Sequence, residues 1–309
     1  MRRLLAGELT RGPQGERIAQ GLLLVAPALF ATNMLVARAA ADFIPPVALA
    51  FWRWFLVFLM MLPLAGPSLW RQREVLRAEW PVLTLLGALG MGVCGAFVYI
   101  GAHSTTATNI GLIYANSPVL IVLLAAVCFG ERLRPVQLLG AGLAFAGMLV
   151  LVAKGDPGVL LDLRFVAGDL WIAAATLGWS VYSVVLRYVP SRLDGMTRFT
   201  AICLFGVAVL LPFHLWEAVT LGPPTLDLRT VGFVLLLAVV AGFAAYQVYG
   251  LILQTLGAAR TGLLLYLMPL YNAGLAVLLL GERLHGYHLA GAALVIPGLL
   301  LANAATRRR

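Results

Sequence analysis

One charged side chain, Arg53, lies inside an apolar segment of the sequence, residues 46–65. An arginine at the centre of a membrane span costs about 2.5–3.5 kcal/mol on insertion scales, so its charge needs compensation. One interpretation is a cation that faces a cavity and attracts a carboxylate. The other is a side chain that reaches toward the outer lipid headgroups or bonds to a neighbouring carbonyl. The sequence is compatible with both.

Polar and aromatic side chains at the depth of other apolar segments are candidates for binding a solute. Asparagine and glutamine can hydrogen-bond to a zwitterion, and tyrosine and tryptophan can stack on an apolar or aromatic group. The alternative for each residue alone is a contact between helices. Together they favour a neutral amphiphilic solute over a sugar nucleotide, whose phosphates call for several cations. The candidates are Asn33, Tyr99, Asn116, Trp179, Tyr182, Tyr246, Gln247 and Tyr266.

Catalytic and metal-binding chemistry has little support in the sequence. An intramembrane enzyme needs paired aspartates, a metal cluster or an activated serine at depth, and no such arrangement is found. His285 and His288 have no third ligand, and the three cysteines all lie in apolar runs. We therefore expect no metal, no cofactor and no catalytic residue. No Asp or Glu lies near the middle of an apolar segment, which favours a facilitative carrier over one coupled to protons or sodium.

These residues must be positioned by membrane-spanning helices. Of the 309 residues, 61% are hydrophobic and only 11% charged, a balance typical of a chain that lipid solvates. About 20 apolar residues are needed to cross ~30 Å of hydrocarbon as a helix. Ten segments meet this length, so the predicted fold is an all-α integral membrane protein with ten transmembrane helices. The predicted segments are 18–38, 46–65, 80–101, 107–129, 135–153, 168–188, 195–216, 229–254, 260–280 and 286–304.

The distribution of basic residues predicts the orientation of the chain. Of the 22 Lys and Arg residues, 16 lie on the side of the N-terminus and five on the opposite side. Because basic loops stay in the cytoplasm, both termini are predicted to be cytoplasmic. The net charge of +9 is scattered singly between apolar segments, so a nucleic-acid partner is not expected. The single lysine among the 22 basic residues favours a bacterial source, and the predicted partners are the lipid bilayer and a small-molecule substrate.

An internal repeat divides the chain. Residues 107–151 align without a gap with 258–302, at a constant offset of 151 and with 16 identities in 45 positions. Five segments per repeat is an odd number, so the second unit is predicted to enter the membrane upside down. The predicted organisation is a cytoplasmic tail (1–17), a first five-helix unit (18–153), an external connection (154–167), a second, inverted unit (168–304) and a basic tail (305–309). Inverted repeats are typical of carriers that expose a central site to each side in turn.

Two motifs recur at the repeat offset. Pro118 and Pro269 lie within apolar segments, and each is predicted to kink its helix, either as a hinge or cavity lining or as a static kink. A Gly-Glu-Arg-Leu sequence follows the fourth segment and again the ninth, and it predicts a glycine helix stop and a tight turn. For its glutamates a structural role is favoured over substrate contact. The residues concerned are Gly130 and Glu131 in the first copy and Gly281 and Glu282 in the second.

With ten segments, a five-plus-five repeat and paired Gly-Glu-Arg-Leu turns, each after a mid-segment proline, the sequence resembles the drug/metabolite transporter superfamily, in particular its EamA-type exporters, over nearly its whole length. The resemblance implies an inner-membrane exporter of amino acids or related metabolites, and the branch exporting aromatic and other neutral amino acids is the most similar. Carriers of another metabolite or a drug-like solute, an intramembrane enzyme, a channel and a non-transporting helper subunit are the alternatives. Whether the chain acts as a monomer or a homodimer stays open.

Overall fold

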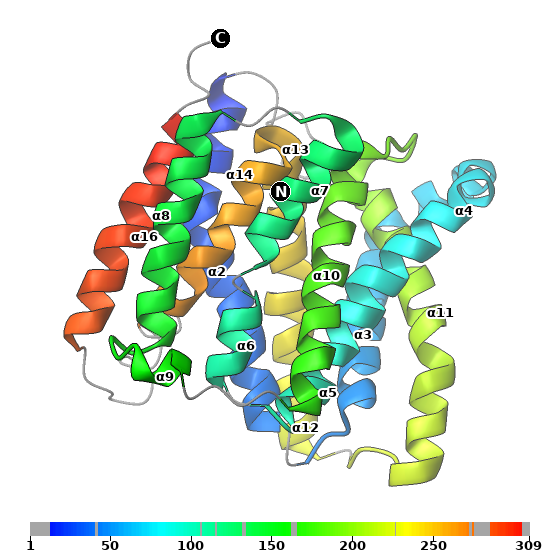
Figure 1. The fold of residues 1–309 in the computed structure, drawn as a ribbon. Helices are drawn as coiled ribbons and strands as arrows, with labels where there is room; N and C mark the ends of the chain where they lie inside the picture. Colours follow the sequence, from blue (N-terminus) through cyan, green and yellow to red (C-terminus); the bar gives the residue numbers. More distant parts are fainter. Residues whose placement is uncertain are drawn as a thin grey trace.

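The computed structural model describes residues 13–40, 43–105, 107–114, 116–131, 134–161, 166–225, 227–271, 274 and 285–304, and every regular element within these ranges is helical. The helices form a bundle whose members run along a common direction (Figure 1). In chain order the elements are α2 (Pro13–Ala40), α3 (Pro46–Arg71), α4 (Arg73–Gly87), η2 (Ala88–Phe97), α5 (Val98–Ala102), α6 (Ala107–Tyr114), α7 (Ser117–Phe129), α8 (Pro135–Val152), α9 (Gly158–Leu161), α10 (Ala167–Tyr188), α11 (Gly195–Leu221), α12 (Leu228–Leu236), η3 (Leu237–Ala244), α13 (Ala245–Leu256), α14 (Ala258–Gly262), η4 (Leu263–Leu267) and α16 (Gly286–Ala304).

Seven helices in the described part of the chain are long and apolar enough to cross a membrane. This confirms the predicted all-α membrane class. The helices α2 and α16 coincide with the first and last predicted segments, and α14 begins the predicted segment 260–280, most of whose second half lies outside the described residues. The total of ten spans therefore stays a prediction.

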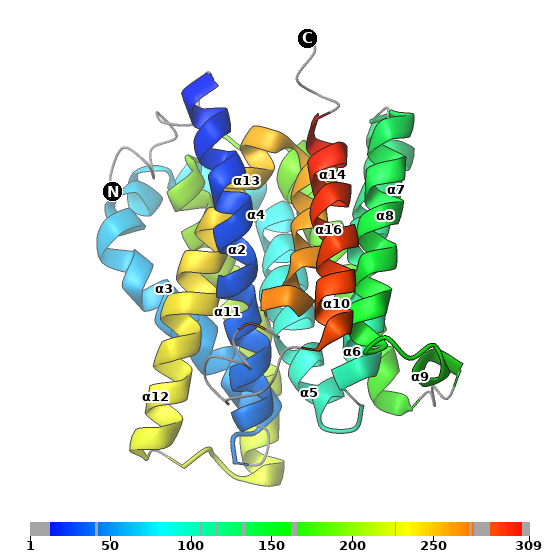
Figure 2. The same ribbon diagram turned by 90° about the vertical axis from the view of Figure 1, so that its left-hand side faces the viewer.

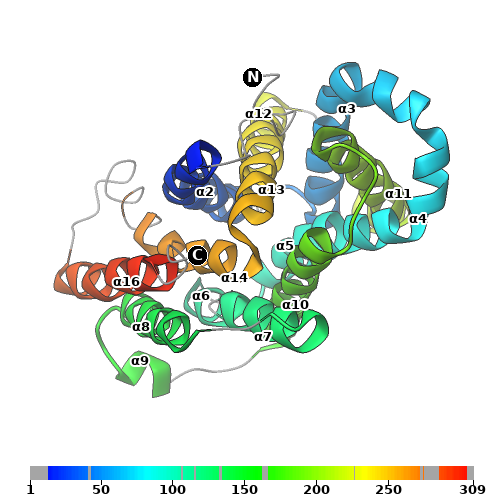
Figure 3. The same cartoon turned by 90° about the horizontal axis from the view of Figure 1, so that it is seen from above.

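The helices α8 and α16 pack against each other at one edge of the bundle, opposite the edge formed by α3, α4 and α11 (Figure 3). Glycines make the contact. A Cβ atom on Gly140 would lie 2.6 Å from the carbonyl oxygen of Gly298, and one on Gly147 would lie 2.8 Å from that of Gly291. Only a residue without a side chain lets the two backbones come this close.

The fourth predicted segment is interrupted. Helix α6 ends at Tyr114 and α7 begins at Ser117, so Pro118 occupies the second position of a new helix, where its missing N–H breaks no hydrogen bond. The equivalent segment in the second half changes from α14 to the 3₁₀ turn η4 shortly before Pro269. Both helices thus lose regular geometry at corresponding positions.

Two π-helical stretches interrupt the third and eighth predicted segments. They are η2, between α4 and α5 within the long helix Arg73–Ala102, and η3, between α12 and α13 within the long helix Leu228–Leu256. The helix from α12 to α13 can be followed in Figure 2. A π-helix has a wider turn than an α-helix, and such stretches are frequent at functional sites. Here the carbonyl of Gly90 in η2 accepts from the Tyr246 hydroxyl, and that of Ala241 in η3 accepts from Arg53.

The turn after α7 has the predicted form. Gly130 has φ 66° in the left-handed region and ends α7, and Pro135 is the first residue of α8. The Glu131 carboxylate accepts a hydrogen bond from the Tyr188 hydroxyl on α10, whose ring stacks on Phe129 at 4.5 Å. Glu131 therefore ties the turn to a neighbouring helix. The second copy of the turn, with Gly281 and Glu282, lies outside the described residues.

The first turn of α3 is capped by a side chain from a distant helix. Its N-cap residue is Pro45, which has no side-chain acceptor, and Glu217 at the end of α11 takes this role. The two carboxylate oxygens of Glu217 accept from the backbone N–H groups of Val47 and Ala48, at 3.0 and 2.6 Å. A carboxylate at a helix N-terminus is favoured by both the free N–H groups and the helix dipole.

Replacing Glu217 by alanine is expected to lower the free energy of unfolding by about 2 kcal/mol, because two N–H groups lose a charged acceptor. Thermal unfolding of the purified protein in detergent measures this. The variant Glu217→Gln keeps one acceptor oxygen, so its free energy of unfolding should lie between those of the parent and of Glu217→Ala. Glu74, exposed in the first turn of α4, supplies the control variant Glu74→Ala. Equal unfolding temperatures for the two alanine variants would contradict the capping role.

Candidate functional site

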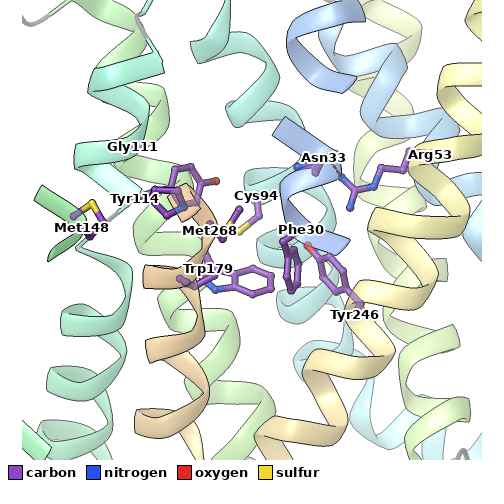
Figure 4. A pocket seen from close by; sticks show the side chains of 12 residues that line it. Phe30, Asn33, Arg53, Cys94, Gly111, Tyr114, Met148, Trp179, Tyr246 and Met268 are labelled. Atoms are coloured by element: carbon purple, nitrogen blue, oxygen red, sulfur yellow. Dashed lines mark hydrogen bonds between the residues drawn. The ribbon is translucent and has the colours of Figure 1, made fainter. Parts of the chain in front are cut away.

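A cavity of about 110 Å³ lies inside the bundle, at the place where both interrupted helices meet (Figure 4). Gly111 and Tyr114 line it from α6, and Leu265, Met268 and Pro269 line it from the corresponding region of the second half. Paired helix interruptions of this kind mark the binding sites of carriers built from repeats. The remaining lining residues come from α2, α3, η2, α8, α10 and α13. They are Phe30, Asn33, Arg53, Cys94, Met148, Trp179 and Tyr246.

Arg53 lies at one side of the cavity and is only 2% exposed. Its Nη1 donates to Asn33 Oδ1 at 2.8 Å and to the Tyr99 hydroxyl at 2.9 Å. Its Nη2 donates to the Ala241 carbonyl at 2.7 Å, and its guanidinium lies 4.6 Å from the ring centre of Trp54. Arg53 therefore joins four helical segments, α2, α3, α5 and η3.

The charge of Arg53 is solvated by neutral groups. Among the described residues its hydrogen-bond acceptors are an amide, a hydroxyl and a carbonyl, and neither ion pair found there involves it. Its Nε atom is buried without a hydrogen-bond partner. A buried cation held this way is an incomplete site, because a carboxylate would add the charge compensation that amides and hydroxyls lack.

Three aromatic rings form another side of the cavity. Phe30 and Trp179 have ring centres 5.5 Å apart in an edge-to-face arrangement, and Tyr246 lies 5.5 Å from Trp179 and 5.9 Å from Phe30. Figure 4 shows the rings of Phe30 and Tyr246 side by side below Asn33 and Arg53. This aromatic wall, the rings of Phe30, Trp179 and Tyr246, offers an apolar surface next to the cation. The cavity thus combines one positive group with an apolar surface.

Several residues predicted from the sequence come together here. Asn33, Arg53, Trp179, Tyr246 and Pro269 line the cavity, and Tyr99 adjoins it through hydrogen bonds from Arg53 and to Asn33 Oδ1, the latter at 2.8 Å. Arg53 is held inside the bundle by its hydrogen bonds to Asn33, Tyr99 and the Ala241 carbonyl. Its side chain both faces the cavity and bonds to a neighbouring carbonyl.

The other candidates lie elsewhere. Asn116 is exposed, and its amide donates to the carbonyls of Leu112 and Ile113 at the end of α6, where the helix break frees them. Gln247 points toward the Met61 sulfur, at 3.8 Å.

Tyr182 and Tyr266 are both almost fully buried and are not among the residues that line the cavity. Tyr182 packs under Trp179 and Gly90. Tyr266 packs beside Phe145. Pro118 is also buried, and a Cβ atom on Gly262 of α14 would lie 3.5 Å from its Cα.

Most of the lining residues absent from the sequence prediction are apolar or small, and nothing in their type distinguishes them from packing residues. The paired helix interruptions are the signal that could have located four of them, Gly111, Tyr114, Leu265 and Met268, because these residues lie on the two interrupted segments. No such signal exists for Phe30, Cys94 and Met148.

A bundle of membrane-length helices around an internal cavity, with a buried cation and an apolar wall, defines a membrane transporter. The chain matches the EamA-like transporter family over residues 17–153 and again over residues 166–304, and it belongs to this family. Two copies of the family unit thus cover almost the whole chain, one in each half.

Similar proteins agree with this assignment. An uncharacterized transporter of Archaeoglobus fulgidus is 27% identical over 92% of this chain and 96% of its own length. A protein of Escherichia coli named "Probable amino-acid metabolite efflux pump" is 26% identical over 91% of this chain and 93% of its own. A solved crystal structure with a TM-score of 0.74 and 26% identity covers 94% of this chain and 98% of that one.

Proposed function

We propose that the protein exports small neutral amino acids, which it carries through the membrane by alternating access of the central cavity. The observation that carries this proposal is Arg53, which is 2% exposed, lines the cavity and is solvated by neutral groups. In this mechanism the substrate carboxylate binds the guanidinium. The names of relatives such as the Escherichia coli efflux pump, and of an aromatic amino acid exporter of Ancylobacter novellus that is 30% identical over 56% of this chain, support the same substrate class.

The substrate side chain would pack on the aromatic wall. An engineered cavity of about 150 Å³ accepts benzene in another protein, so the cavity here, about 110 Å³, suits a small aliphatic side chain in its present form. An aromatic side chain requires the cavity to widen as the carrier opens. We infer that size is selected by Phe30, Trp179 and Tyr246, and charge by Arg53.

Alternating access is supported by symmetric features of the two halves. At the repeat offset of 151, Gly140 corresponds to Gly291 and Gly147 to Gly298. The contact of Gly140 with Gly298 is therefore equivalent to that of Gly291 with Gly147. The same offset relates Gly90 and Ala241, whose carbonyls in η2 and η3 accept side-chain hydrogen bonds. These pairs favour ten helices in two inverted units.

The proposal includes a facilitative mechanism in the bacterial inner membrane, with both termini in the cytoplasm. No carboxylate is among the residues that line the cavity in the described part of the chain, so a coupling proton or sodium ion has no acidic site there. The family and its named relatives are transporters, which favours a carrier over the intramembrane enzyme.

Counterflow in reconstituted liposomes tests the function. Liposomes loaded with a neutral amino acid should accumulate the same labelled amino acid, with saturation and with competition by other small neutral amino acids. The corresponding amines, which lack the carboxylate, should not compete. Non-saturable flux would indicate a channel, and competition by the amines as strong as that by the amino acids would contradict a carboxylate site.

The asparagine next to Arg53 gives a second prediction. Asn33→Ala removes an acceptor for both Arg53 and Tyr99, so we expect the apparent affinity for substrate to fall by about tenfold, the effect of one lost hydrogen bond to a charged group. Gln247→Ala is the matched control, because that amide lies away from the cavity, and its affinity should stay within about twofold. Concentration dependence of counterflow measures both. A larger effect at Gln247 than at Asn33 would place the site elsewhere.

A further inference from the structure

A buried carboxylate fastens two helices together at the end of the bundle where α6 begins, here called the α6 end. Asp169, in the first turn of α10, is 4% exposed and accepts from the Thr105 hydroxyl and from Asn109 Nδ2, the latter at 2.9 Å. It also accepts from the N–H of Val166, which caps its own helix. The start of α10 is thereby tied to the turn before α6 and to α6 itself.

An acidic side chain makes a corresponding contact at the opposite end, where α14 begins, here called the α14 end. Glu16, in the first turn of α2, lies 3.5 Å from Arg260, the third residue of α14. Arg260 is 6% exposed, and its Nη2 has no hydrogen-bond partner in the described part of the chain. Breaking this ion pair would leave a buried guanidinium without a counter-charge.

The two contacts occupy equivalent positions in the two halves. Asn109 is the third residue of α6, and the repeat offset of 151 places it on Arg260. Both acids lie in the first turn of the helix that begins a half, α2 in one and α10 in the other. Each contact joins residues from different halves, and Figures 1 and 2 show α6 and α14 near opposite ends of the bundle.

Three of the four helical segments joined by these contacts line the cavity, and the fourth, α14, leads directly into η4, which also lines it. Phe30 and Asn33 line it from α2, Trp179 from α10 and Gly111 from α6, and Leu265 in η4 follows α14 directly. Separation of α6 from α10 at one end, or of α2 from α14 at the other, would therefore move segments next to the cavity apart at that end.

We propose that the Asp169 contact and the Glu16–Arg260 ion pair are the two latches of the transport cycle, each closing one end of the path to the cavity. This inference rests on the proposed alternating access. In the present structure both latches are formed. Opening toward one side requires that the latch at that end break while the other holds. Loss of one latch shifts the population toward the state that is open at its own end.

Cys94 provides a native probe, because it lines the cavity and is 8% exposed. Replacing Cys128 and Cys203 by serine leaves it as the single thiol. A charged, membrane-impermeant thiol reagent is then added from one side of proteoliposomes in which the protein has been sorted into a single orientation by a terminal tag. Thr105→Val should raise the rate of Cys94 labelling from the α6 end by about tenfold and leave the rate from the α14 end unchanged. Glu16→Gln should do the reverse.

Two controls separate latch loss from general loosening. Thr105→Ser keeps the hydroxyl and should label like the parent, and Glu74→Gln removes an exposed acid from the first turn of α4 without touching α14. Equal labelling of variants and controls, or an equal rise from both ends, would overturn the latch assignment. In the parent protein, labelling of Cys94 from both sides, slowed by substrate, supports alternating access independently of the latches. Labelling from one side only would refute both the latches and the proposed mechanism.

Discussion

Arg53→Gln is expected to reduce amino-acid counterflow by at least about 100-fold. The variant removes the one cation of the cavity lining in the described chain and leaves an amide that cannot pair with a carboxylate by charge. Removing one partner of a buried charge pair typically costs about 3–5 kcal/mol, and about 1.4 kcal/mol corresponds to a tenfold change in affinity. Initial rates of counterflow over a range of substrate concentrations measure the loss, which should appear mainly as a weaker apparent affinity for the substrate.

Arg53→Lys separates charge from geometry. A lysine retains the positive charge but donates from a single nitrogen, so it cannot reach Asn33, Tyr99 and the Ala241 carbonyl together. We expect transport between that of the parent and of Arg53→Gln. Because Arg53 joins four segments, each variant must first be shown to be folded by its elution volume and unfolding temperature. Folded Arg53→Gln protein that transports at the parent rate would remove Arg53 from the binding site.

Hydropathy placed the helices well but not their ends. It predicted that a helix begins at residue 80, whereas α4 begins at Arg73, because the first turns carry Glu74 and Arg77 and extend beyond the apolar part. Hydropathy reports which residues lipid can solvate, and a helix continues past that limit as long as its backbone is paired. The π-helical stretches η2 and η3 were not predictable, since their Gly, Ala, Leu and Val residues also occur in regular transmembrane helices.

Residue types in the sequence identified some of the residues at the cavity and also suggested others that lie elsewhere. Arg53 stood out because a charge at depth is rare, and the structure shows it at the cavity. Asn33 and Asn116 looked alike in the sequence, yet one bonds to Arg53 and the other to the free carbonyls at its own helix break. The difference depends on which helix face meets the other half of the molecule. A local sequence pattern does not contain that information.

The contact between α8 and α16 gives the second large expected effect. Gly140→Val is expected to lower the free energy of unfolding by about 3 kcal/mol, at the upper end of overpacking costs, because even its Cβ would lie 2.6 Å from the backbone of Gly298 and of Ala302. Neither backbone can move away without separating the helices. For a chain of this size the unfolding temperature should fall by roughly 6–12 °C, measured by thermal unfolding in detergent.

Gly142 supplies the matched control for this prediction, two residues along the same helix. A Cβ there meets nothing within 4 Å, and the position is exposed, so Gly142→Val should unfold at or slightly above the parent temperature, since valine favours a helix more than glycine does. Gly147→Val should resemble Gly140→Val, because Gly147 meets Gly291 just as Gly140 meets Gly298. Equal stability of Gly140→Val and Gly142→Val would contradict the close approach of α8 and α16. The symmetric contact between these helices could then no longer support two inverted units.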